Sequence, residues 1–265
     1  MNFIPKKSLG QNFLINQSII NRILDVCNLK DTDIVLEIGP GQGALTYDLI
    51  DRVKEFYCIE IDKRLAQNIQ DRTVDKNNID IIQTDFLKFS IDKSLPQEEI
   101  KVISNLPYNS ATAILEKLLM FRKKWSAIYV MVQLEHAQRM LAVPRTKKYG
   151  AFSCFMQYYS DMKILFKIPK SAFKPMPKVE SCFMEILPKK ELDIKVNDEK
   201  VFWRVIKQAF QQRRKTLINS LSGVYDKVEL IGVCDKLKIP LNARAEELNL
   251  KCFAGLADGL MVKKN

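Results

Sequence analysis

Histidine is almost absent from this sequence, since the 265 residues include only His136. The six cysteines stand apart without a CxxC pair, so neither the ligand spacing of a zinc site nor a disulfide framework is suggested. No apolar run approaches the roughly 20 residues that a membrane-spanning helix requires. These absences predict a protein with no metal site and no membrane span, whose cysteines are reduced thiols.

The amino end of the chain, MNFIPKKSLGQNFLINQ, interrupts every short apolar run with Pro, Lys, Gly, Gln or Asn. Such interruptions spoil the apolar core of a secretion signal. We therefore expect an unexported, cytoplasmic protein. The length and the 47% of hydrophobic residues allow a sizeable core, in one large domain or in two smaller ones.

The net charge of +11 is distributed unevenly along the chain. Residues 1–143 contain equal numbers of basic and acidic side chains, and the whole positive excess lies in the 122 residues that follow. A one-sided basic field favours a polyanionic partner, most simply nucleic acid, because binding to phosphates releases counterions. A merely basic surface explains the charge equally well, so charge alone leaves both interpretations open.

Between Asp33 and Gln133, short β-branched runs alternate with segments whose apolar residues recur at helical spacing. This alternation is typical of a parallel sheet with helices on both faces. The expected strands are DIVLEIG, EFYCIEI, IDIIQT, KVISNL and AIYVMVQ, and the expected helices are ALTYDLIDRV, KRLAQNIQDR and ATAILEKLLM. Two later strands, MKILFKI and VESCFMEIL, have no helix between them, so we expect an antiparallel hairpin at the end of the sheet.

Beyond the strands the pattern is wholly helical, in the segments EKVFWRVIKQAFQQ, RKTLINSL, DKVELIGVCDKL and AEELNLKCFAGLADGL. A polar linker from Pro188 to Asn197 separates these segments from the strands. The sequence therefore predicts an α/β domain over residues 1–190 and a smaller all-helical domain over residues 191–265.

A glycine-rich stretch, VLEIGPGQGALT, follows an expected strand and opens a helix. Gly39, Gly41 and Gly43 therefore lie where the backbone turns tightly and a ligand can approach it. Glycine spacing alone is not specific, because Gly39, Gly41 and Ala44 also fit the dinucleotide-binding pattern, with Glu60 as the acid about 20 residues further on. A ribose-binding acid serves NAD and the adenosine of S-adenosylmethionine equally well.

Two further carboxylates favour S-adenosylmethionine. Glu37 precedes the first glycine and can lie near the cationic amino and sulfonium groups, whereas it would repel a pyrophosphate. Asp85 follows the third strand and can accept a hydrogen bond from an adenine amino group, while Phe86 packs on the ring. Each carboxylate also has a purely structural interpretation. Glu37 could be a solvated strand residue, and Asp85 could be a turn or N-cap residue. Their order along successive strand ends favours a methyltransferase cofactor site.

The fourth strand ends in Asn105-Leu106-Pro107-Tyr108, at the edge of the sheet where open α/β folds bind ligands. The N6 amine of adenine is a poor nucleophile because its lone pair is delocalised. The Asn105 side-chain oxygen and the Leu106 carbonyl are two acceptors that can draw its N–H bonds out of the ring plane. Pro107 biases Leu106 toward an extended backbone, and Tyr108 offers an aromatic face. The competing interpretation is a strand end with a proline turn and a core tyrosine.

With these motifs the chain resembles the small-subunit ribosomal RNA adenine N6-dimethyltransferase family of the KsgA type. The resemblance rests on an ordered series of segments over nearly the whole chain: KKSLGQNFL, LEIGPGQGALT, IEID, TDFL, NLPYN, FKPMPKVES and QQRRKTLINSL. The series is specific, although no single segment is. Two departures, Glu180 for the usual Asp and Ser110-Ala111 for Ile-Ser, touch neither proposed acceptor.

The resemblance implies a Rossmann-like class I methyltransferase sheet with a small helical domain, and S-adenosylmethionine as methyl donor. It implies N6,N6-dimethylation of two adjacent adenosines in a hairpin loop near the 3′ end of small-subunit rRNA, within an assembly intermediate of that subunit. We expect the protein to act as a monomer. The positions that match the family's cofactor contacts are Asn12, Leu14, Gly39, Glu60, Asp85 and Asn105, and we expect Gln11, Gly41 and Phe86 to complete that site.

The resemblance also implies that Phe173 of FKPMP sandwiches the target base with Tyr108, a role that the residues alone do not suggest. A base inside a duplex is out of reach, so the target must come from a loop or be flipped out. The basic residues expected to contact phosphates are Arg145, Lys147, Lys148, Lys174, Lys178, Arg213, Arg214 and Lys215.

Three alternatives remain at this point. A large-subunit rRNA adenine methyltransferase of the macrolide-resistance type shares the cofactor motifs but is opposed by the segment RRKTLINSL. A non-catalytic assembly or transcription factor on the same fold is opposed by the intact Asn105, Tyr108 and Phe173. A nicotinamide oxidoreductase would use the same glycine pattern.

Overall fold

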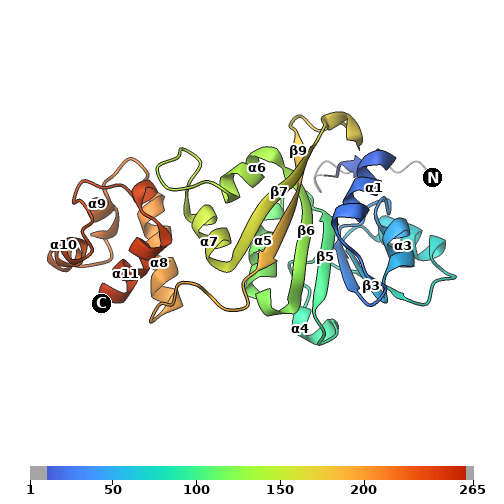
Figure 1. Ribbon diagram of the computed structural model, residues 1–265, viewed down its shortest axis with the longest axis horizontal. Coiled ribbons are helices and arrows are strands. Elements are labelled where there is room, and N and C mark those ends of the chain that lie inside the picture. Colours follow the sequence, from blue (N-terminus) through green and yellow to red (C-terminus); the bar gives the residue numbers. More distant parts are fainter. Residues whose placement is uncertain (1–10, 261–265) are drawn as a thin grey trace. The chain divides into compact units, whose positions relative to one another are not determined.

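The chain divides into two compact units in the computed structural model, which describes residues 11–260. The first unit runs to Ala137 and resumes over Ser160–Lys190, and the second comprises Gln138–Tyr159 and the chain from Glu191 onward. Figure 1 shows a sheet flanked by helices in the first unit and helices alone from α8 to α11.

The first unit is built on a seven-stranded sheet of order β4-β3-β2-β5-β6-β9-β7. Its strands are β2 (Ile34–Ile38), β3 (Glu55–Glu60), β4 (Ile79–Gln83), β5 (Ile100–Asn105), β6 (Trp125–Gln133), β7 (Ser160–Ile168) and β9 (Ser181–Pro188). The five strands from β4 to β6 are parallel, and β9 pairs antiparallel with both β6 and β7. The predicted sheet and its terminal hairpin are confirmed.

Helices connect the parallel strands, as the alternating pattern predicts. They are α2 (Thr46–Leu49), α3 (Lys63–Arg72), α4 (Ile91–Ser94) and α5 (Ala111–Met120), with short 3-10 turns η2 (Ile50–Arg52) and η3 (Arg122–Lys124). Helix α1 (Gln17–Val26) precedes the first parallel strand, and α6 (Leu134–Met140) follows the last. Side chains fix several starts: Asp62 accepts a hydrogen bond from the Arg64 N–H at α3, and Asn16 accepts one from the Ile19 N–H at α1. The segment ALTYDLIDRV is less helical than expected, since it contains only α2 and η2.

The centre of the sheet is covered on both faces. All five residues of β2 are buried, which is why its sequence IVLEI is nearly continuously apolar instead of alternating. On one face, α1 contributes Ile23 and Leu24 to a cluster with Phe56 of β3 and Phe183 of β9. Burial of this apolar surface stabilises the sheet and fixes the positions of its carboxyl ends.

A second, two-stranded sheet was not expected from the sequence. Strand β1 (Phe13–Leu14) pairs antiparallel with β8 (Phe173–Lys174), which follows the 3-10 turn η4 (Lys170–Ala172). The strands are two residues long, too short for a periodic signal in the sequence. This pairing brings the beginning of the described chain to the loop between β7 and β9.

The second unit contains α7 (Ala151–Tyr159), α8 (Glu199–Gln211), α9 (Leu217–Leu221), α10 (Lys227–Lys236), η5 (Ala245–Glu247) and α11 (Leu250–Gly259). Helix α7 packs on α8 through aromatic rings, with the centroids of Tyr158 and Phe202 4.9 Å apart. The Trp203 indole N–H also donates to the Tyr159 hydroxyl at 2.9 Å. The expected domain limits therefore need one correction, because residues 138–159 group with the helical unit and not with residues 1–137. Chain order concealed this, since α7 lies between two strands of the sheet.

None of the helices within residues 11–260 has the length and apolar character that crossing a bilayer requires. The six cysteines all lie in this part of the chain, and none of them is in a disulfide.

Candidate active site

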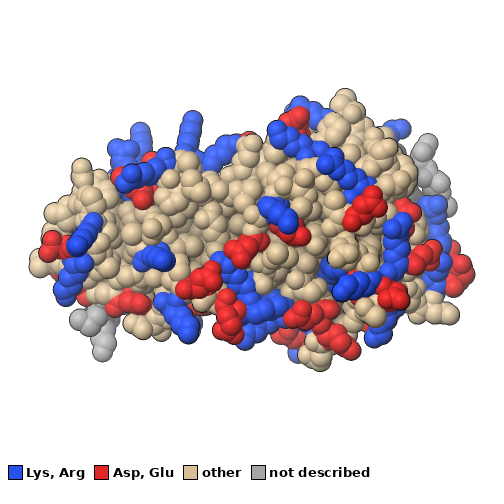
Figure 2. Space-filling model, viewed as in Figure 1, with Lys and Arg blue, Asp and Glu red and all other residues tan. Residues whose placement is uncertain are grey.

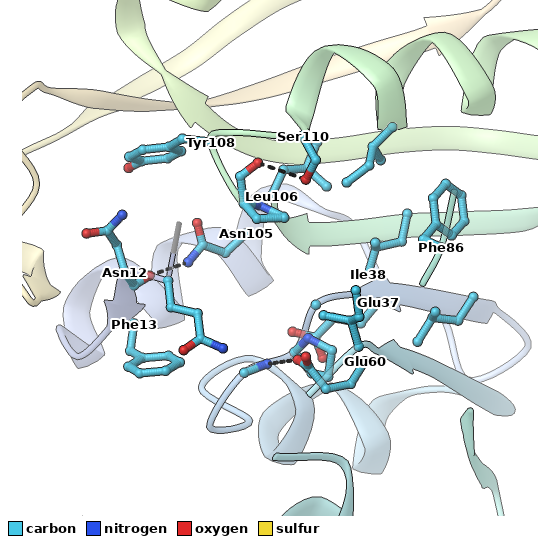
Figure 3. A pocket seen from close by; sticks show the side chains of 18 of the residues that line it. Asn12, Phe13, Glu37, Ile38, Glu60, Phe86, Asn105, Leu106, Tyr108 and Ser110 are labelled. Carbon is cyan, nitrogen blue, oxygen red and sulfur yellow. Dashed lines mark hydrogen bonds between the residues drawn. The ribbon is translucent and has the colours of Figure 1, made fainter. Parts of the chain in front are cut away.

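A cavity of about 270 Å³ opens at the carboxyl ends of β2, β3 and β5. Its lining includes every residue predicted to bind the cofactor: Gln11, Asn12, Leu14, Gly39, Gly41, Glu60, Asp85, Phe86 and Asn105. Leu106, Pro107 and Tyr108 of the predicted catalytic segment also line it. Residues from five separate stretches of the chain therefore converge on one cavity (Figure 3).

The glycine loop after β2 adopts the left-handed backbone that glycine tolerates. The φ angles of Gly39, Gly41 and Gly43 are 68°, 61° and 82°. A Cβ on Gly41 would lie 3.0 Å from the Phe13 ring, and one on Gly43 would lie 2.5 Å from the Tyr47 ring. Both positions therefore require glycine, for backbone conformation and for space.

Glu60, at the end of β3, ties this loop to the sheet. Its buried carboxylate accepts a hydrogen bond from the backbone N–H of Gly41 at 3.1 Å (Figure 3). It also accepts one from the backbone N–H of Asp62 at 2.8 Å. Burial raises its pKa, and these two backbone bonds act in the opposite direction. An ionised carboxylate has about four acceptor positions, so it retains capacity for ribose hydroxyls.

Glu37 lies deeper, with 2% of its surface exposed. Burial raises its pKa to about 8, the hydrogen bond from Thr46 opposes the rise, and the charge of Glu60 adds to it. The Thr46 hydroxyl donates at 2.7 Å. No Lys or Arg of residues 11–260 forms an ion pair with Glu37, and a cationic ligand beside this carboxyl would favour its ionised form. Thr46 was missed by the sequence analysis, although its place in the first turn after the glycine loop was a usable signal.

Asp85 and Phe86, which follow β4, also line the cavity. The Asp85 carboxylate accepts the Leu87 N–H at 2.9 Å, which is the turn interaction that the competing interpretation expected. This bond occupies one oxygen and leaves the other available for a ligand. Ile61 and Leu87, 46% and 40% exposed, also line the cavity. Sequence analysis missed both, although apolar residues after acidic strand ends are consistent with a planar apolar ligand.

The Asn105 amide is held in one orientation. Its Nδ2 donates to the Asn12 carbonyl at 3.0 Å, and Figure 3 shows its oxygen directed away from that bond, on the side of Tyr108. No donor among residues 11–260 is bonded to this oxygen. The Leu106 N–H donates to the Met131 carbonyl at 3.2 Å, which anchors the segment to β6. The Asn105 oxygen is therefore an available acceptor beside the cavity, as the proposed chemistry needs.

Pro107 begins a turn that leads into α5, since its carbonyl accepts the Ser110 N–H at 3.1 Å. The Tyr108 hydroxyl lies 2.5 Å from the Ser181 hydroxyl at the start of β9. Burial raises the Tyr108 pKa, and the Ser181 hydrogen bond opposes that rise. Tyr108 is thus a half-buried ring with a fixed hydroxyl, and it lines the cavity instead of packing wholly into the core.

Phe173 does not lie where the resemblance implies. It is 3% exposed, pairs with Leu14 in the β1–β8 ladder and belongs to the same apolar cluster as Leu14. It is absent from the lining of the cavity. In this conformation Phe173 is a core residue, and its ring lies in the apolar cluster with Leu14 and not in the cavity.

The basic residues lie on both units and all are exposed. In the second unit, the structure brings Arg145, Lys147 and Lys148 beside the segment 213–215. The Arg213 guanidinium donates to the Lys147 carbonyl and to the Glu246 carboxylate, both at 2.8 Å. Figure 2 shows Lys and Arg side chains projecting along the edge of this unit, whereas blue and red side chains intermingle over the first unit. Lys174 and Lys178 lie on the first unit.

Residues 11–260 contain no group of three or more His, Cys, Asp or Glu side chains arranged to hold a metal ion. His136 lies on α6 and is partly buried.

Known proteins resemble this chain over nearly its whole length. The ribosomal RNA adenine dimethylase family matches residues 2–258. The "Ribosomal RNA small subunit methyltransferase A" of Streptococcus pneumoniae serotype 2 is 39% identical over 97% of this chain and 92% of the relative. The protein of the same description from a Geobacillus species is 38% identical over the same shares of the two chains.

Two solved structures share the fold. The dimethyladenosine transferase of Plasmodium falciparum has a TM-score of 0.79 at 24% identity, over 92% of this chain and 95% of that one. The 23S rRNA methyltransferase ErmE has a TM-score of 0.70 at 25% identity, over 94% and 99%. The predicted fold class is confirmed, and the small-subunit enzymes are more similar in sequence than ErmE. The chain belongs to the ribosomal RNA adenine dimethylase family.

Proposed function

We propose that this protein transfers methyl groups from S-adenosylmethionine to the N6 amines of two adjacent adenosines, in a hairpin loop near the 3′ end of small-subunit rRNA. The membership of the rRNA adenine dimethylase family supports the reaction class, and relatives at 38–39% identity named for the small subunit support the substrate. The observation that carries the proposal is the hydrogen bond between Asn105 Nδ2 and the Asn12 carbonyl, which presents the Asn105 oxygen beside the cofactor cavity.

The residues of the cavity fit S-adenosylmethionine. Its positive charge suits the buried Glu37, and its ribose hydroxyls suit Glu60. The glycine loop lines the cavity with the backbone of Gly39 and Gly41, which no side chain of their own covers. When bound, S-adenosylmethionine supplies an electrophilic methyl group whose sulfur leaves with the bonding electrons. NAD fits less well, because a pyrophosphate beside Glu37 would meet an acid in place of a cation.

The chain's own residues prepare the amine for attack. The Asn105 oxygen and the Leu106 carbonyl accept hydrogen bonds from the N–H groups of the amine. These bonds localise the nitrogen lone pair and stabilise the positive charge that develops on the nitrogen. Tyr108 stacks on the base. A neutral amide does this without the desolvation cost of a second buried carboxylate. One N–H proton is released after each transfer.

Stacking of Phe173 on the other face of the target base, opposite Tyr108, requires a conformational change in the protein. Phe173 is buried against Leu14 in the structure, so its proposed stacking role needs the β1–β8 pairing to rearrange when RNA binds. We propose that the basic residues of both units contact phosphates of the rRNA within an assembly intermediate of the small subunit. We also propose that the protein acts as a monomer, in the cytoplasm where such subunits are assembled.

Incubation with labelled S-adenosylmethionine and unmethylated small subunits, followed by nucleoside analysis, tests this function. The expected product is N6,N6-dimethyladenosine at two positions per subunit. Label in large subunits would instead support the macrolide-resistance type of activity. Association with small subunits without any methyl transfer would support a non-catalytic assembly factor. Stabilisation by NADH in place of S-adenosylmethionine in a melting experiment would point to an oxidoreductase.

A further inference from the structure

One lysine outside the motifs closes the loop that forms the far wall of the cavity. The ammonium group of Lys117, on α5, donates to the backbone carbonyls of Phe86, Leu87 and Phe89 at 2.7, 3.0 and 2.6 Å. It also lies 5.1 Å from the centre of the Phe86 ring. One side chain therefore holds three carbonyls and one ring of the same short loop.

The loop held by Lys117 is a single turn fixed at both ends. At its start the Asp85 carboxylate accepts the Leu87 N–H, and the Asp85 carbonyl accepts the N–H groups of Lys88 and Phe89. At its end the carbonyl oxygens converge on the Lys117 ammonium. A compact cation with three donors satisfies three carbonyls that one amide or hydroxyl cannot.

The charge of Lys117 is kept close to the ring that lines the cavity. Burial lowers the Lys117 pKa and the nearby Asp85 carboxylate opposes that change. A partly desolvated ammonium bonded to carbonyls is strongly oriented, because charge-assisted hydrogen bonds are about twice as strong as neutral ones. Phe86 is buried, and it lines the cavity together with Asp85 and Leu87.

We propose that Lys117 is a positioning residue for the adenine of the methyl donor, which sets affinity and base discrimination by fixing the loop that carries Asp85 and Phe86. This inference rests on the proposed function. Lys117 follows Asn105–Ser110 on α5, so the helix that begins after the catalytic segment also holds the wall on which the adenine would bind. The loop's backbone is thereby coupled to the catalytic segment through one helix.

Calorimetric titration with S-adenosylhomocysteine and with S-inosylhomocysteine tests the proposal. The second ligand carries hypoxanthine, whose oxygen cannot donate to the Asp85 carboxylate. We expect Lys117→Met to weaken binding of S-adenosylhomocysteine about tenfold, or about 1.4 kcal/mol, and to bring the two dissociation constants closer together. In methyl transfer, KM for S-adenosylmethionine should rise by a similar factor, with kcat at saturation within about twofold of the parent.

Lys124→Met is the matched control. The Lys124 ammonium also donates to a backbone carbonyl, that of Pro96, in a loop that does not line the cavity. We expect this variant to bind both ligands like the parent. Lys117→Gln provides a second variant that retains donors and should give an intermediate loss.

Several outcomes would overturn the proposal. Equal losses in Lys117→Met and Lys124→Met, or an unchanged ratio between the two ligands, would show that Lys117 contributes only to folding stability. A parent protein that binds neither ligand would contradict the proposed function itself. A parent that binds S-adenosylhomocysteine normally and a Lys117→Met variant that binds it equally well would contradict only the role of Lys117.

Discussion

The hydroxyl oxygens of Tyr108 and Ser181 lie 2.5 Å apart, across the join between the catalytic segment and the terminal hairpin. Tyr108 follows the parallel strand β5, whereas Ser181 opens the antiparallel strand β9. Ser181 is fully buried and its strand is held by both β6 and β7. The ring proposed to stack on the target base is therefore oriented by the antiparallel end of the sheet.

Removing this hydrogen bond should impair use of the RNA substrate. We expect Ser181→Ala to lower kcat/KM for small subunits about tenfold, because the Tyr108 ring loses its fixed orientation. Binding of S-adenosylhomocysteine, measured by calorimetry, should not change. Tyr108→Phe removes the same bond from the other side, and the double variant should lose little more than either single one. Additive losses would contradict the coupling.

Replacing the Asn105 amide should separate chemistry from cofactor binding. We expect Asn105→Ala to lower the methylation rate by about 10²- to 10³-fold, since one preorganised acceptor of the reacting amine is lost. Asn105→Asp should also be poor, because a carboxylate cannot donate to the Asn12 carbonyl. Single-turnover methylation with quantified nucleosides measures the effect, and Asn77→Ala, in an exposed loop outside the cavity, is the control. Near-parental activity of Asn105→Ala would refute the mechanism.

The raised pKa of Glu37 predicts a pH-dependent affinity for S-adenosylmethionine. The carboxyl has a pKa of about 8 in the free protein because it is buried, and a cationic ligand favours its ionised form. Affinity should therefore increase from pH 6 to pH 8, by at most about tenfold per unit, and become constant above pH 8. Calorimetry across this range measures the slope. Glu37→Gln should abolish it, and a flat profile in the parent would contradict the prediction.

The same group should lower the stability of the free protein at high pH. Its folded pKa lies above the ordinary value of 4.5, so folding is favoured when the carboxyl is protonated. The Glu37 contribution to the free energy of unfolding is therefore constant below about pH 4.5, decreases up to about pH 8 and then stays constant. Urea unfolding of the parent and of Glu37→Gln should differ most at pH 8. Curves that stay parallel from pH 5 to pH 8 would contradict this.

A structural ion pair lies at the amino ends of β2 and β5, away from the cavity at their carboxyl ends. The Lys101 ammonium lies 2.6 Å from the Asp33 carboxylate and donates to the Cys27 and Asn28 carbonyls. Both side chains are largely buried, so we expect Lys101→Met to lower the free energy of unfolding by about 3 kcal/mol. Binding of S-adenosylhomocysteine should be retained. Lys54 pairs with Glu55 in an exposed setting, and Lys54→Met should cost less than about 1 kcal/mol. Equal costs in urea unfolding would refute the distinction.

The basic residues of the second unit should differ in how they affect RNA binding. Arg214→Ala and Lys215→Ala should each reduce the slope of log affinity against log salt by about one, as loss of one phosphate contact predicts. Arg213→Ala should in addition lower the stability, because Arg213 is bonded to Glu246 and to the Lys147 carbonyl. Filter binding at several salt concentrations, with melting temperatures, measures both. An unchanged slope in Arg214→Ala would contradict the proposed contact.

Much of the first unit could be predicted from the chain because each element buries its own apolar pattern. Helix α3 has the predicted limits, Lys63–Arg72, since Asp62 caps its start and Leu65, Ala66 and Ile69 form one apolar face. The segment RKTLINSL was predicted less well, because α9 covers only Leu217–Leu221 after the Thr216 cap. The convergence of these residues on one cavity could be predicted because the carboxyl ends of parallel strands lie on the same side of the sheet.

The sequence by itself determined the order of strands and helices, the glycine loop and the acids and amide at the strand ends. These depend on local conformation and on spacing along the chain. Only the tertiary structure decided that Phe173 is buried against Leu14, that Ser181 fixes Tyr108, that Lys117 holds the Asp85–Phe89 loop, and that residues 138–159 group with the helical unit. Each of these depends on contacts between segments far apart in the chain, and no spacing along the chain encodes such a contact.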